Sequence, residues 1–473
     1  MIHFDVMIIG SGPAGQKAAI QAAKAGKSVA VVEQLREVGG ACVQFGTIPS
    51  KALREKTRLH AQAMKRIEAL GIELPSFTVN VAGLIGEMDS VVKAHDGYMR
   101  EQLERNGVKI IHGRASFESA TTLNVRYVDG HVDTFNADHI LVATGSKPRH
   151  LKHVPVDHEF IYDSDSILSL AYLPQSMVVL GGGVIACEYA SIFATLGVKV
   201  TLIDRYPLPL GFLDQDLARG FLRAFERIGG VFLGNVEVAG VAFDGISAVT
   251  TEFVDGTRIS SDKLLCALGR VSQLDGLKID QAGVLVSDNG LVVADSNGQT
   301  NVAHIYAAGD VIGPPSLASA SMEQGRRAAC SFLGIPLGDQ GDFIPSGIYS
   351  IPELASVGVT EAQAEAQAKE TNGEIVVGYA GFNEIARGHI AGTADGFLKL
   401  IADGNGQLLG VHILGAEATD LIHIGQMGLI HGAGLDVYID NIFNFPTYAE
   451  CYRVAALQAQ AKLQARAQDA RVA

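Results

Sequence analysis

Cysteine is scarce in this sequence and shows no sign of pairing. The 473 residues include five cysteines, an odd number, without the close spacing of a zinc site or a disulfide framework. This usage excludes a disulfide-stapled secreted domain and favours a reducing compartment, so we expect a cytoplasmic protein. Four of the thiols are expected to be small buried apolar groups, and Cys42 is set apart by its neighbours. The four are Cys187, Cys266, Cys330 and Cys451.

Positive charge is also in short supply. There are 37 lysines and arginines against 51 aspartates and glutamates, which gives a formal net charge of -14, and the basic residues are scattered. A protein that binds nucleic acid or an anionic membrane surface carries a basic patch. We therefore expect neither partner, and small-molecule chemistry is favoured.

No long apolar run is free of interruption. Residues 177–200 are long enough to resemble a membrane span, but they contain three consecutive glycines and Glu188. This pattern favours a strand, a turn and a buried helix. Residues 1–5 lead directly into an apolar strand and lack the basic start and cleavage site of a secretory signal. We expect no membrane insertion.

A phosphate-binding turn stands near the start of the chain. Residues 5–9 predict a buried strand, Gly10, Gly12 and Gly15 follow, and residues 16–25 predict a helix. Glycines at this spacing form the turn, admit a pyrophosphate and allow close helix packing. A second strand over residues 28–33 ends in Glu33, 23 positions after Gly10, where a carboxylate can hold ribose hydroxyls. The alternative is a packing turn with a solvated Glu33.

The same pattern returns later in the chain. A strand beginning at residue 177 leads into Gly181 and Gly183, Ala186 takes the place of the third glycine, and a strand over residues 199–204 ends in Asp204. Asp204 again lies 23 positions after the first glycine. Two such units imply two dinucleotides, and a flavin with a nicotinamide is the pair between which hydride can pass.

Two further segments connect these units. Residues 141–146, with Thr144 and Gly145, predict a strand entering a tight turn, and residues 305–311, with Gly309 and Asp310, predict a strand ending in an acid. Their positions on either side of the second nucleotide unit suggest a first domain interrupted by a second. At 473 residues and 48% hydrophobic composition, we expect about three domains of roughly 150 residues each.

Several long motifs then identify a resemblance. Over essentially its whole length the chain resembles the flavoprotein disulfide reductase superfamily, also called the pyridine nucleotide-disulfide oxidoreductases. Within it, the chain is most similar to the soluble pyridine nucleotide transhydrogenases, the Si-specific NAD(P)+ transhydrogenases. The motifs are residues 46–51, 162–168, 309–313, 347–353 and 443–447.

The resemblance implies an α/β fold of two Rossmann-like dinucleotide-binding domains, for FAD and for NAD(P), the second inserted in the first. A C-terminal α+β dimerisation domain is implied as well, and with it a homodimer or higher homo-oligomer. The boundaries that follow are FAD-binding residues 1–150 and 276–342, NAD(P)-binding residues 151–275, and dimerisation residues 343–473.

The implied cofactor is FAD, with NAD(H) and NADP(H) as substrates. Glu33 is expected on the adenosine ribose and Asp310 near the ribityl and pyrophosphate groups. The expected FAD-binding residues are Gly10, Gly12, Gly15, Glu33, Gly40, Cys42, Thr47, Lys51, Thr144, Gly145, Gly309 and Asp310. The expected NAD(P)-binding residues are Gly181, Gly183, Ala186, Glu188, Asp204, Arg205 and Gly269.

Position 47 departs from the disulfide reductases. Residues 39–51 resemble their redox-disulfide segment, but Thr47 stands where the second cysteine would be. A hydroxyl cannot exchange with a disulfide as a thiolate does, so no sulfur relay can form. Phe445 likewise occupies the place of the histidine that serves thiol substrates, and phenylalanine carries no proton, although Glu450 remains. Both losses argue against a disulfide substrate.

Lys51 and Glu188 match a buried ion pair beside the reactive flavin nitrogen in the superfamily, and we expect these two residues to be catalytic. A fixed cation there would stabilise the negative charge that arriving hydride builds. The alternative is two solvated surface residues. Cys42 is expected on the flavin face opposite the nicotinamide, where a lone thiol either packs quietly or tunes the flavin.

The expected activity is a reversible, ping-pong hydride transfer between NADPH and NAD+ through FAD. Asp204 opposes it in part, since a carboxylate there suits the ribose of NAD and repels the 2'-phosphate of NADP. Arg205 could offset the repulsion, or could be an ordinary solvated arginine. The first alternative function is an NADH-dependent flavin reductase or diaphorase that passes electrons to a quinone, dye or oxygen. The second is a nucleotide-redox-sensing binding protein.

Overall fold

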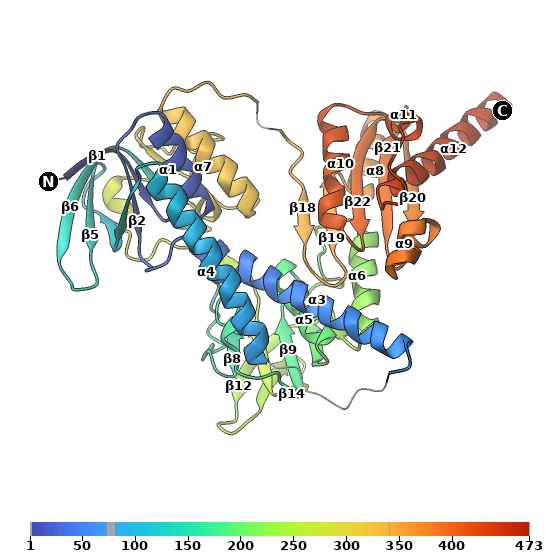
Figure 1. Ribbon diagram of the computed structural model, residues 1–473, viewed down its shortest axis with the longest axis horizontal. Coiled ribbons are helices and arrows are strands. Elements are labelled where there is room, and N and C mark those ends of the chain that lie inside the picture. The colour runs from blue at the N-terminus through green and yellow to red at the C-terminus, as the bar shows by residue number, and fades with distance from the viewer. Residues whose placement is uncertain (1, 73–80, 340, 473) are drawn as a thin grey trace. The chain divides into compact units, whose positions relative to one another are not determined.

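The computed structural model describes residues 2–72, 81–339 and 341–472 (Figure 1). The chain divides into two compact units. The first comprises Met1–Pro174, Gly240–Thr250 and Asp262–Asp339, and the second comprises Gln175–Ala239, Thr251–Ser261 and Gln340–Ala473.

A mainly parallel sheet forms the centre of the first unit. Its order is β3-β2-β1-β6-β5-β4, with β17 paired to β6. The strands are β1 (Ile2–Ile9), β2 (Val29–Glu33), β3 (Lys109–His112), β4 (Arg114–Phe117), β5 (Thr122–Arg126), β6 (Val132–Val142) and β17 (Ile305–Ala307). β17 runs parallel to β6, with Ile305 opposite Ile140. The sheet is thus completed by chain that returns after the second glycine motif, which confirms the predicted insertion.

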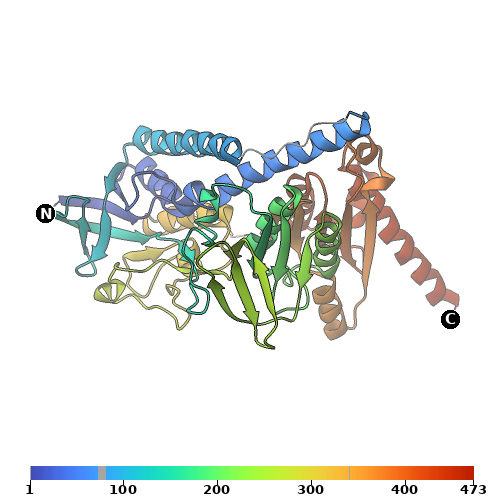
Figure 2. The same ribbon diagram turned by 90° about the horizontal axis from the view of Figure 1, so that it is seen from below.

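Alternating residues of β1 supply both faces of this sheet. Val6 and Ile8 pack with the alanines of α1 (Pro13–Lys24) and α7 (Ala318–Phe332), whereas Met7 and Ile9 enter the core on the other face. This alternation is the two-residue period of an extended strand. α1 and α7 lie side by side (Figure 1). α4 (Val81–Arg105) packs against α1 and β3 (Figure 2).

The first unit also contains several shorter strands and helices. β7 and β16 pair antiparallel, and β8 pairs with β15 in parallel. The elements are α2 (Gly40–Gln44), α3 (Thr47–Ala69), β7 (Ser146–Pro148), β8 (Ile161–Asp163), η1 (Ile167–Ser169), β15 (Lys263–Cys266), β16 (Arg270–Ser272), η2 (Ile279–Ala282) and η3 (Asp310–Ile312).

The second unit contains the second glycine motif and the C-terminal part of the chain. β9 (Ser176–Leu180), β10 (Lys199–Ile203) and β11 (Val231–Leu233) pair in parallel. α5 (Val184–Thr195) follows β9, and α6 (Gln215–Arg227) follows β10. Residues 177–200 are therefore the expected strand, turn and buried helix. Among the described residues, no helix combines the length and apolarity needed to cross a membrane. The chain also forms β12 (Val238–Phe243), β13 (Val249–Phe253) and β14 (Arg258–Ser261).

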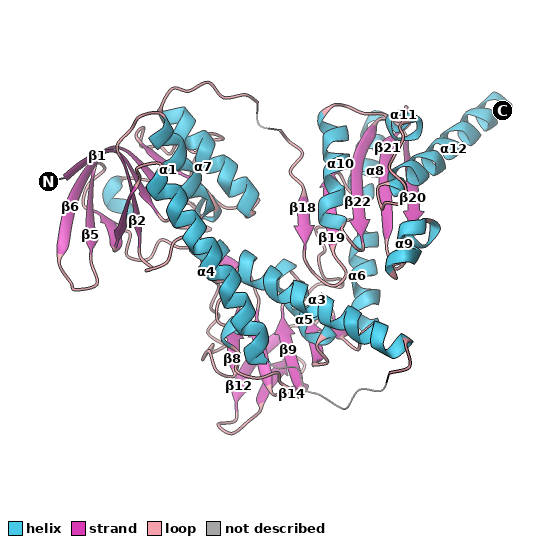
Figure 3. Ribbon diagram, viewed as in Figure 1, coloured by secondary structure: helices cyan, strands magenta, loops and turns pink. Residues whose placement is uncertain are grey.

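An antiparallel sheet with flanking helices forms the C-terminal part, the predicted α+β domain (Figure 3). Its order is β18-β19-β22-β21-β20, and α10 packs on β22 and β19 while α12 packs on β20 and β21. The strands are β18 (Ser346–Ile348), β19 (Leu354–Gly358), β20 (Ile375–Gly381), β21 (Phe397–Asp403) and β22 (Leu408–Leu414). The helices are α8 (Glu361–Thr371), η4 (Phe382–Glu384), α9 (Ala386–Ala391), α10 (Ala418–Ile430), α11 (Leu435–Asp440) and α12 (Glu450–Val472).

The structure corrects some predicted element ends. Strand β1 begins at Ile2 rather than residue 5, because its first residues also pair with β6. Helix α1 begins at Pro13, since proline suits the first helical turn. Asp310 does not end a strand: β17 stops at Ala307, and Gly309 at φ +82° turns the chain into η3.

Candidate active site

Close backbone packing forms the first glycine turn. Gly10 and Gly15 have no room for a side chain: a Cβ on Gly10 would lie 2.4 Å from the Ala143 oxygen, and one on Gly15 would lie 2.0 Å from the Gly10 oxygen. Gly12 is the N-cap of α1, so the first N–H groups of the helix point out of the turn. Gly40 begins α2, and a Cβ on it would lie 3.0 Å from the Gly12 Cα. These residues leave a side-chain-free cradle of N–H donors of the kind that holds a pyrophosphate.

Glu33 ends β2 as predicted and is 5% exposed, so the solvated alternative is wrong. Its Oε2 accepts hydrogen bonds from the backbone N–H and the hydroxyl of Ser11, at 3.0 and 2.6 Å, and its Oε1 accepts from the Leu35 N–H at 3.0 Å. An ionised carboxylate has about four acceptor positions. The three bonds therefore fix its direction and leave capacity for a ribose hydroxyl.

Thr144 and Asp310 contribute polar groups near the same turn. The Thr144 hydroxyl oxygen is buried and has no hydrogen-bond partner among the described residues. Such an atom is expected to have a partner, so it fits a site for a polar ligand. Gly145 follows it, and Asp310 begins η3, where its Oδ2 accepts a 2.6 Å bond from the Ser146 hydroxyl. Together with the glycine cradle and Glu33, these groups fit the polar parts of FAD.

The segment with the missing cysteine forms α2 and the start of α3. Burial raises the pKa of the Cys42 thiol, and a hydrogen bond with Thr47 and the charge of Lys51 offset this only in part. Thr47 is the first residue of α3, and Lys51 lies one turn later. A thiol with a raised pKa stays protonated and is a poor nucleophile. This agrees with the quiet-packing interpretation of Cys42.

All five cysteines are free, and only Cys42 is not fully buried. The burial predicted for the other four is therefore confirmed.

The second glycine turn lies between β9 and α5. Gly181 follows β9, Gly183 is the N-cap of α5, and Ala186 lies buried in its first turn. Asp204 comes directly after β10, and its carboxylate lies over Gly182, where a Cβ would be 2.1 Å from the Asp204 Oδ2. Position 182 therefore has to be glycine, because any side chain there would collide with the Asp204 carboxylate. The glycine spacing of the dinucleotide motif does not specify this position.

Arg205 is exposed and rests on the next residue. Its guanidinium lies 4.9 Å from the ring centre of Tyr206, and its Nη2 donates a 2.9 Å hydrogen bond to the Tyr206 hydroxyl. The Tyr206 N–H in turn donates to the Asp204 Oδ1 at 3.3 Å. The acid, the cation and the aromatic ring thus form one local group at the end of β10.

Glu188 is 4% exposed, so the solvated alternative is wrong for this residue. Its Oε1 accepts a 2.8 Å hydrogen bond from the Tyr349 N–H, and the Ser191 hydroxyl on the same helix accepts from the Ile351 N–H at 3.1 Å. Residues 347–353, one of the motifs behind the resemblance, are therefore attached to α5. The Lys51–Glu188 pair and the role of Gly269 stay predictions.

The place of the missing histidine lies at the surface of the C-terminal part. Phe445 is 68% exposed, and the Glu450 Oε2 accepts a hydrogen bond from the Thr447 N–H at 3.3 Å. The Glu450 carboxylate, which would support a proton-transferring base, is thus bonded to the backbone. The position of that base is taken by the apolar ring of Phe445.

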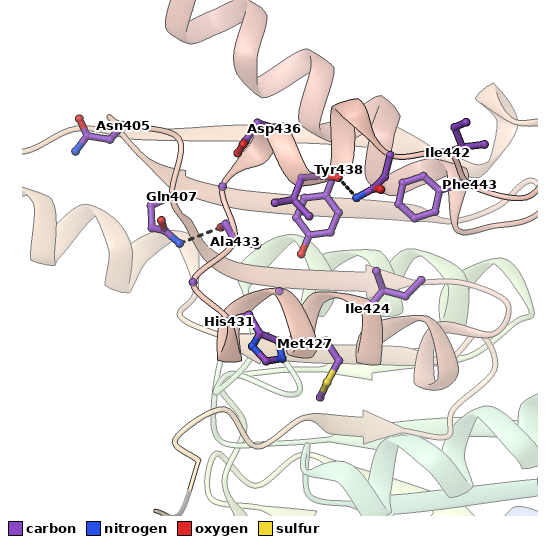
Figure 4. Close-up of a pocket in the computed structure, with 15 residues that line it drawn as sticks. Asn405, Gln407, Ile424, Met427, His431, Ala433, Asp436, Tyr438, Ile442 and Phe443 are labelled. Carbon is purple, nitrogen blue, oxygen red and sulfur yellow. Dashed lines mark hydrogen bonds between the residues drawn. The ribbon is translucent and has the colours of Figure 1, made fainter.

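A pocket of about 810 Å³ opens beside this segment, between α10, α11 and residues 441–443 (Figure 4). Met427, His431 and Tyr438 line it, with Ile442 and Phe443 at one end. Burial raises the pKa of the Tyr438 hydroxyl to about 12. The pocket contains none of the predicted site residues.

Comparison with known proteins decides the family. The Pyridine nucleotide-disulphide oxidoreductase profile matches residues 4–325, and the dimerisation-domain profile of the same name matches residues 344–456. The chain belongs to the pyridine nucleotide-disulphide oxidoreductase family.

Relatives within this family match the chain over nearly its whole length. A protein of Mycobacterium bovis named soluble pyridine nucleotide transhydrogenase is 41% identical, covering 98% of this chain and 99% of the relative. One of the same name from Yersinia enterocolitica is 40% identical, covering 96% and 97%.

Solved structures of the family share the fold. The crystal structure of LpdA from Mycobacterium tuberculosis matches with a TM-score of 0.88 at 25% identity, over 97% of this chain and 99% of that one. The HOCl-induced flavoprotein disulfide reductase RclA from Escherichia coli, as its Cu(II) complex, matches with a TM-score of 0.87 at 27% identity, over the same shares. The predicted fold class is therefore confirmed.

Sequence reasoning missed several residues that contact the predicted site residues in the structure. Ser11 holds Glu33, Gly182 admits Asp204, and Tyr349 holds Glu188. Ser11 and Gly182 occupy the variable positions of the glycine patterns, so an alignment of relatives could have found them. Tyr349 acts through its backbone, which leaves no residue-type signal.

Proposed function

We propose that the protein is an FAD-dependent soluble transhydrogenase that moves hydride reversibly between NADPH/NADP+ and NADH/NAD+ without a redox disulfide. The carrying observation is the single thiol of Cys42 beside Thr47, within a family whose matched profile is named for disulphide chemistry. With no second sulfur, electrons can leave only to a second nucleotide or a small acceptor. The full-length likeness to proteins named transhydrogenase favours the nucleotide.

When bound, FAD supplies a two-electron carrier that accepts and returns hydride. Gly10, Gly12, Gly15 and Gly40 would hold its pyrophosphate region, Glu33 its adenosine ribose, and Asp310 its ribityl side. Lys51 would stabilise negative charge at the reacting ring, and Glu188 would keep that lysine oriented and balance its charge. Cys42, partly buried and with a raised thiol pKa, would fill space there.

One nucleotide pocket would serve both substrates in a ping-pong cycle. Gly181, Gly183 and the start of α5 would hold the pyrophosphate of either nucleotide. Asp204 would bind the ribose hydroxyls of NADH, and Arg205 would turn from Tyr206 to the 2'-phosphate of NADPH. Because the 2'-phosphate lies far from the nicotinamide, the two redox couples are nearly matched, and direction would follow nucleotide ratios.

We expect Arg205→Ala to raise KM for NADPH about 10–100-fold and to leave KM for NADH little changed, because charge-assisted hydrogen bonds are worth about 1.5–3 kcal/mol. Asp204→Asn should do the reverse, since it removes repulsion from NADPH and weakens the ribose contacts of NADH. Steady-state kinetics with each nucleotide measures both changes.

Arg219→Ala is the matched control, because it removes another exposed guanidinium from the same unit, on α6. It should leave both KM values unchanged. Equal loss for NADPH and NADH in Arg205→Ala would exclude Arg205 as the phosphate-recognising residue.

The function itself is tested by steady-state turnover with NADPH and a spectrally distinct NAD+ analogue. Parallel double-reciprocal lines, with no turnover of lipoamide or glutathione disulfide, are the expected result. Measurable disulfide reduction would contradict the proposal, and intersecting lines would contradict the shared pocket.

The carboxylate of Asp204 favours a second candidate function. If its carboxylate repels NADP too strongly, the enzyme would be an NADH-dependent reductase that passes electrons to a quinone, dye or oxygen. Turnover with NADH and a quinone, combined with inertness toward NADPH, would establish this activity.

The matched dimerisation profile supports a homo-oligomer, and we propose a homodimer formed through the C-terminal part. Several large apolar side chains are exposed around α10 and residues 437–445, a composition typical of a covered surface. They are Met427, Ile430, Val437, Ile442 and Phe445, with Ile442 94% exposed. A cytoplasmic location is part of the same proposal.

A further inference from the structure

Arg270 connects three segments of the first unit that are far apart in sequence. Its Nε donates to the Ser146 hydroxyl at 2.9 Å and its Nη2 to the Ser146 backbone oxygen at 2.8 Å. Its Nη1 donates to the Ser164 hydroxyl at 3.0 Å and to the Asp165 Oδ1 at 2.6 Å. The Arg270 and Asp165 side chains are 20% and 29% exposed, so this ion pair is half-buried.

These bonds fix the direction of the Ser146 hydroxyl. Because Arg270 donates to the oxygen, the hydroxyl hydrogen is directed elsewhere, and it is donated to the Asp310 Oδ2 at 2.6 Å. The guanidinium of Arg270 and the carboxylate of Asp310 are both charged, and hydrogen bonds to charged groups are stronger than hydrogen bonds between neutral groups. Arg270 thus acts on the Asp310 carboxylate through one serine.

Asp310 retains one oxygen for a ligand. Its Oδ1 has no hydrogen-bond donor among the described residues, and the side chain is half-buried. With Oδ2 held by Ser146, the carboxylate cannot rotate without losing that bond. The open oxygen is therefore presented in one direction, which suits a hydroxyl group of a bound dinucleotide.

The position of Arg270 in the fold adds a second connection. β7 and β16 pair antiparallel within the first unit, and Ser146 and Arg270 are the first residues of these two strands. Ser164 and Asp165 belong to the motif over residues 162–168, which had no assigned role. Within it, the buried Asp163 accepts hydrogen bonds from the N–H groups of Asp165 and Ser166 and holds the turn.

We propose that Arg270 is a positioning residue for flavin binding, which orients Asp310 through Ser146 and is itself anchored by Ser164 and Asp165. The motif over residues 162–168 then serves the flavin site from outside it. This inference rests on the assignment of the first nucleotide site to FAD. It does not depend on which acceptor takes the hydride.

Fluorescence titration of the apoprotein with FAD tests the proposal without any turnover. Arg270→Met and Ser146→Ala should each raise the Kd for FAD about 10–100-fold, since a hydrogen bond to a charged group contributes about 1.5–3 kcal/mol. The double variant should be no weaker than Arg270→Met alone, because both changes interrupt one path. Lys147→Met is the control, because it breaks the exposed Lys147–Asp275 pair next to Ser146, and it should leave the Kd unchanged.

A merely structural role predicts a different pattern. Arg270→Met would then lower the melting temperature of the apoprotein while Ser146→Ala left FAD affinity at the wild-type value, and this result would overturn the proposal. Additive losses in the double variant would also overturn it. If Arg270→Met does not fold, Ser146→Ala and Asp165→Asn decide, since both retain Arg270 and each removes one of its partners. A wild-type Kd in that pair contradicts the inference.

Discussion

Lys399→Met is expected to lower the free energy of unfolding by about 3–5 kcal/mol, because it removes one partner of a buried ion cluster. Lys399 is 1% exposed and donates to the Asp214 Oδ1 and the Asp216 Oδ2, both at 2.7 Å. It also lies 2.6 Å from the Glu361 Oε2. Asp214 is 2% exposed, so the variant would leave a carboxylate buried without its cation.

The cluster also holds the segment that follows Asp204, a predicted nucleotide-binding residue. Asp214 is the N-cap of α6, where its side chain accepts from the Asp216 N–H, and α6 follows the loop that begins at Asp204. The Leu210 N–H of this loop donates to the Gly182 oxygen at 2.7 Å. The loop is thus held at one end by the glycine turn and at the other by Lys399.

The expected loss depends on pH. Burial opposes ionisation of Asp214, but bonds from Lys399 and the Glu361 N–H outweigh it and hold the pKa below its ordinary value of 3.8. A lowered folded-state pKa contributes stability above the ordinary value, and this contribution is lost as pH falls through the folded pKa. Burial lowers the pKa of Lys399, but its three carboxylate partners outweigh burial and raise the pKa above the ordinary value of 10.5. The stability that Lys399 contributes is therefore fully present below pH 10.5. The difference between wild type and variant should therefore be largest near neutral pH and shrink below about pH 4.

Thermal unfolding of wild type and Lys399→Met at neutral pH and below about pH 4 measures this difference. We expect the variant's Tm to be lower by on the order of 10 °C at neutral pH. Arg227→Met is the control, since the Arg227–Asp395 pair of the same unit is 60% and 82% exposed and should contribute about 0–1 kcal/mol. An equal Tm for Lys399→Met and Arg227→Met would show that the buried cluster contributes no more than a surface pair.

Lys51→Met is expected to slow hydride uptake from NADPH about 100–1000-fold while FAD stays bound, because a fixed charge at the reacting ring acts only as negative charge develops. Methionine matches the length of the lysine stem, so packing along α3 is kept. Stopped-flow reduction under anaerobic conditions measures the rate, and the flavin spectrum of the purified variant reports FAD content.

Lys56→Met controls for the loss of a lysine from the same helix. Lys56 is 40% exposed and pairs with Glu87, and neither is a predicted site residue. The flavin of the Lys56→Met variant should be reduced by NADPH at the wild-type rate. If Lys51→Met also does so, the proposed role of Lys51 in hydride transfer is wrong.

The sequence predicted the parts of this molecule that local rules determine. Glycine spacing and a strand-end acid located both turns, because a phosphate cradle needs N–H donors and no side chains within a short stretch. The order of the segments around the second motif predicted the interrupted domain, which the pairing of β17 with β6 confirms.

Networks between distant positions could not be predicted. Lys399 lies 185 residues from Asp214, and Arg270 lies 124 residues from Ser146. In the sequence each is an ordinary charged residue, and only folding brings its partners together. The exact end of β17 was also missed, since the turn at Gly309 depends on local backbone geometry rather than on apolar pattern.

Anaerobic titration with NADPH tests the central claim most directly, because it counts how many hydrides the protein stores. With Thr47 in place of a second thiol, we expect one NADPH per FAD to bleach the flavin completely, and a later addition of an NAD+ analogue to recover that hydride as reduced analogue in equal amount. Uptake of a second equivalent, or failure of NADPH to bleach a flavin that NADH bleaches, would contradict the account.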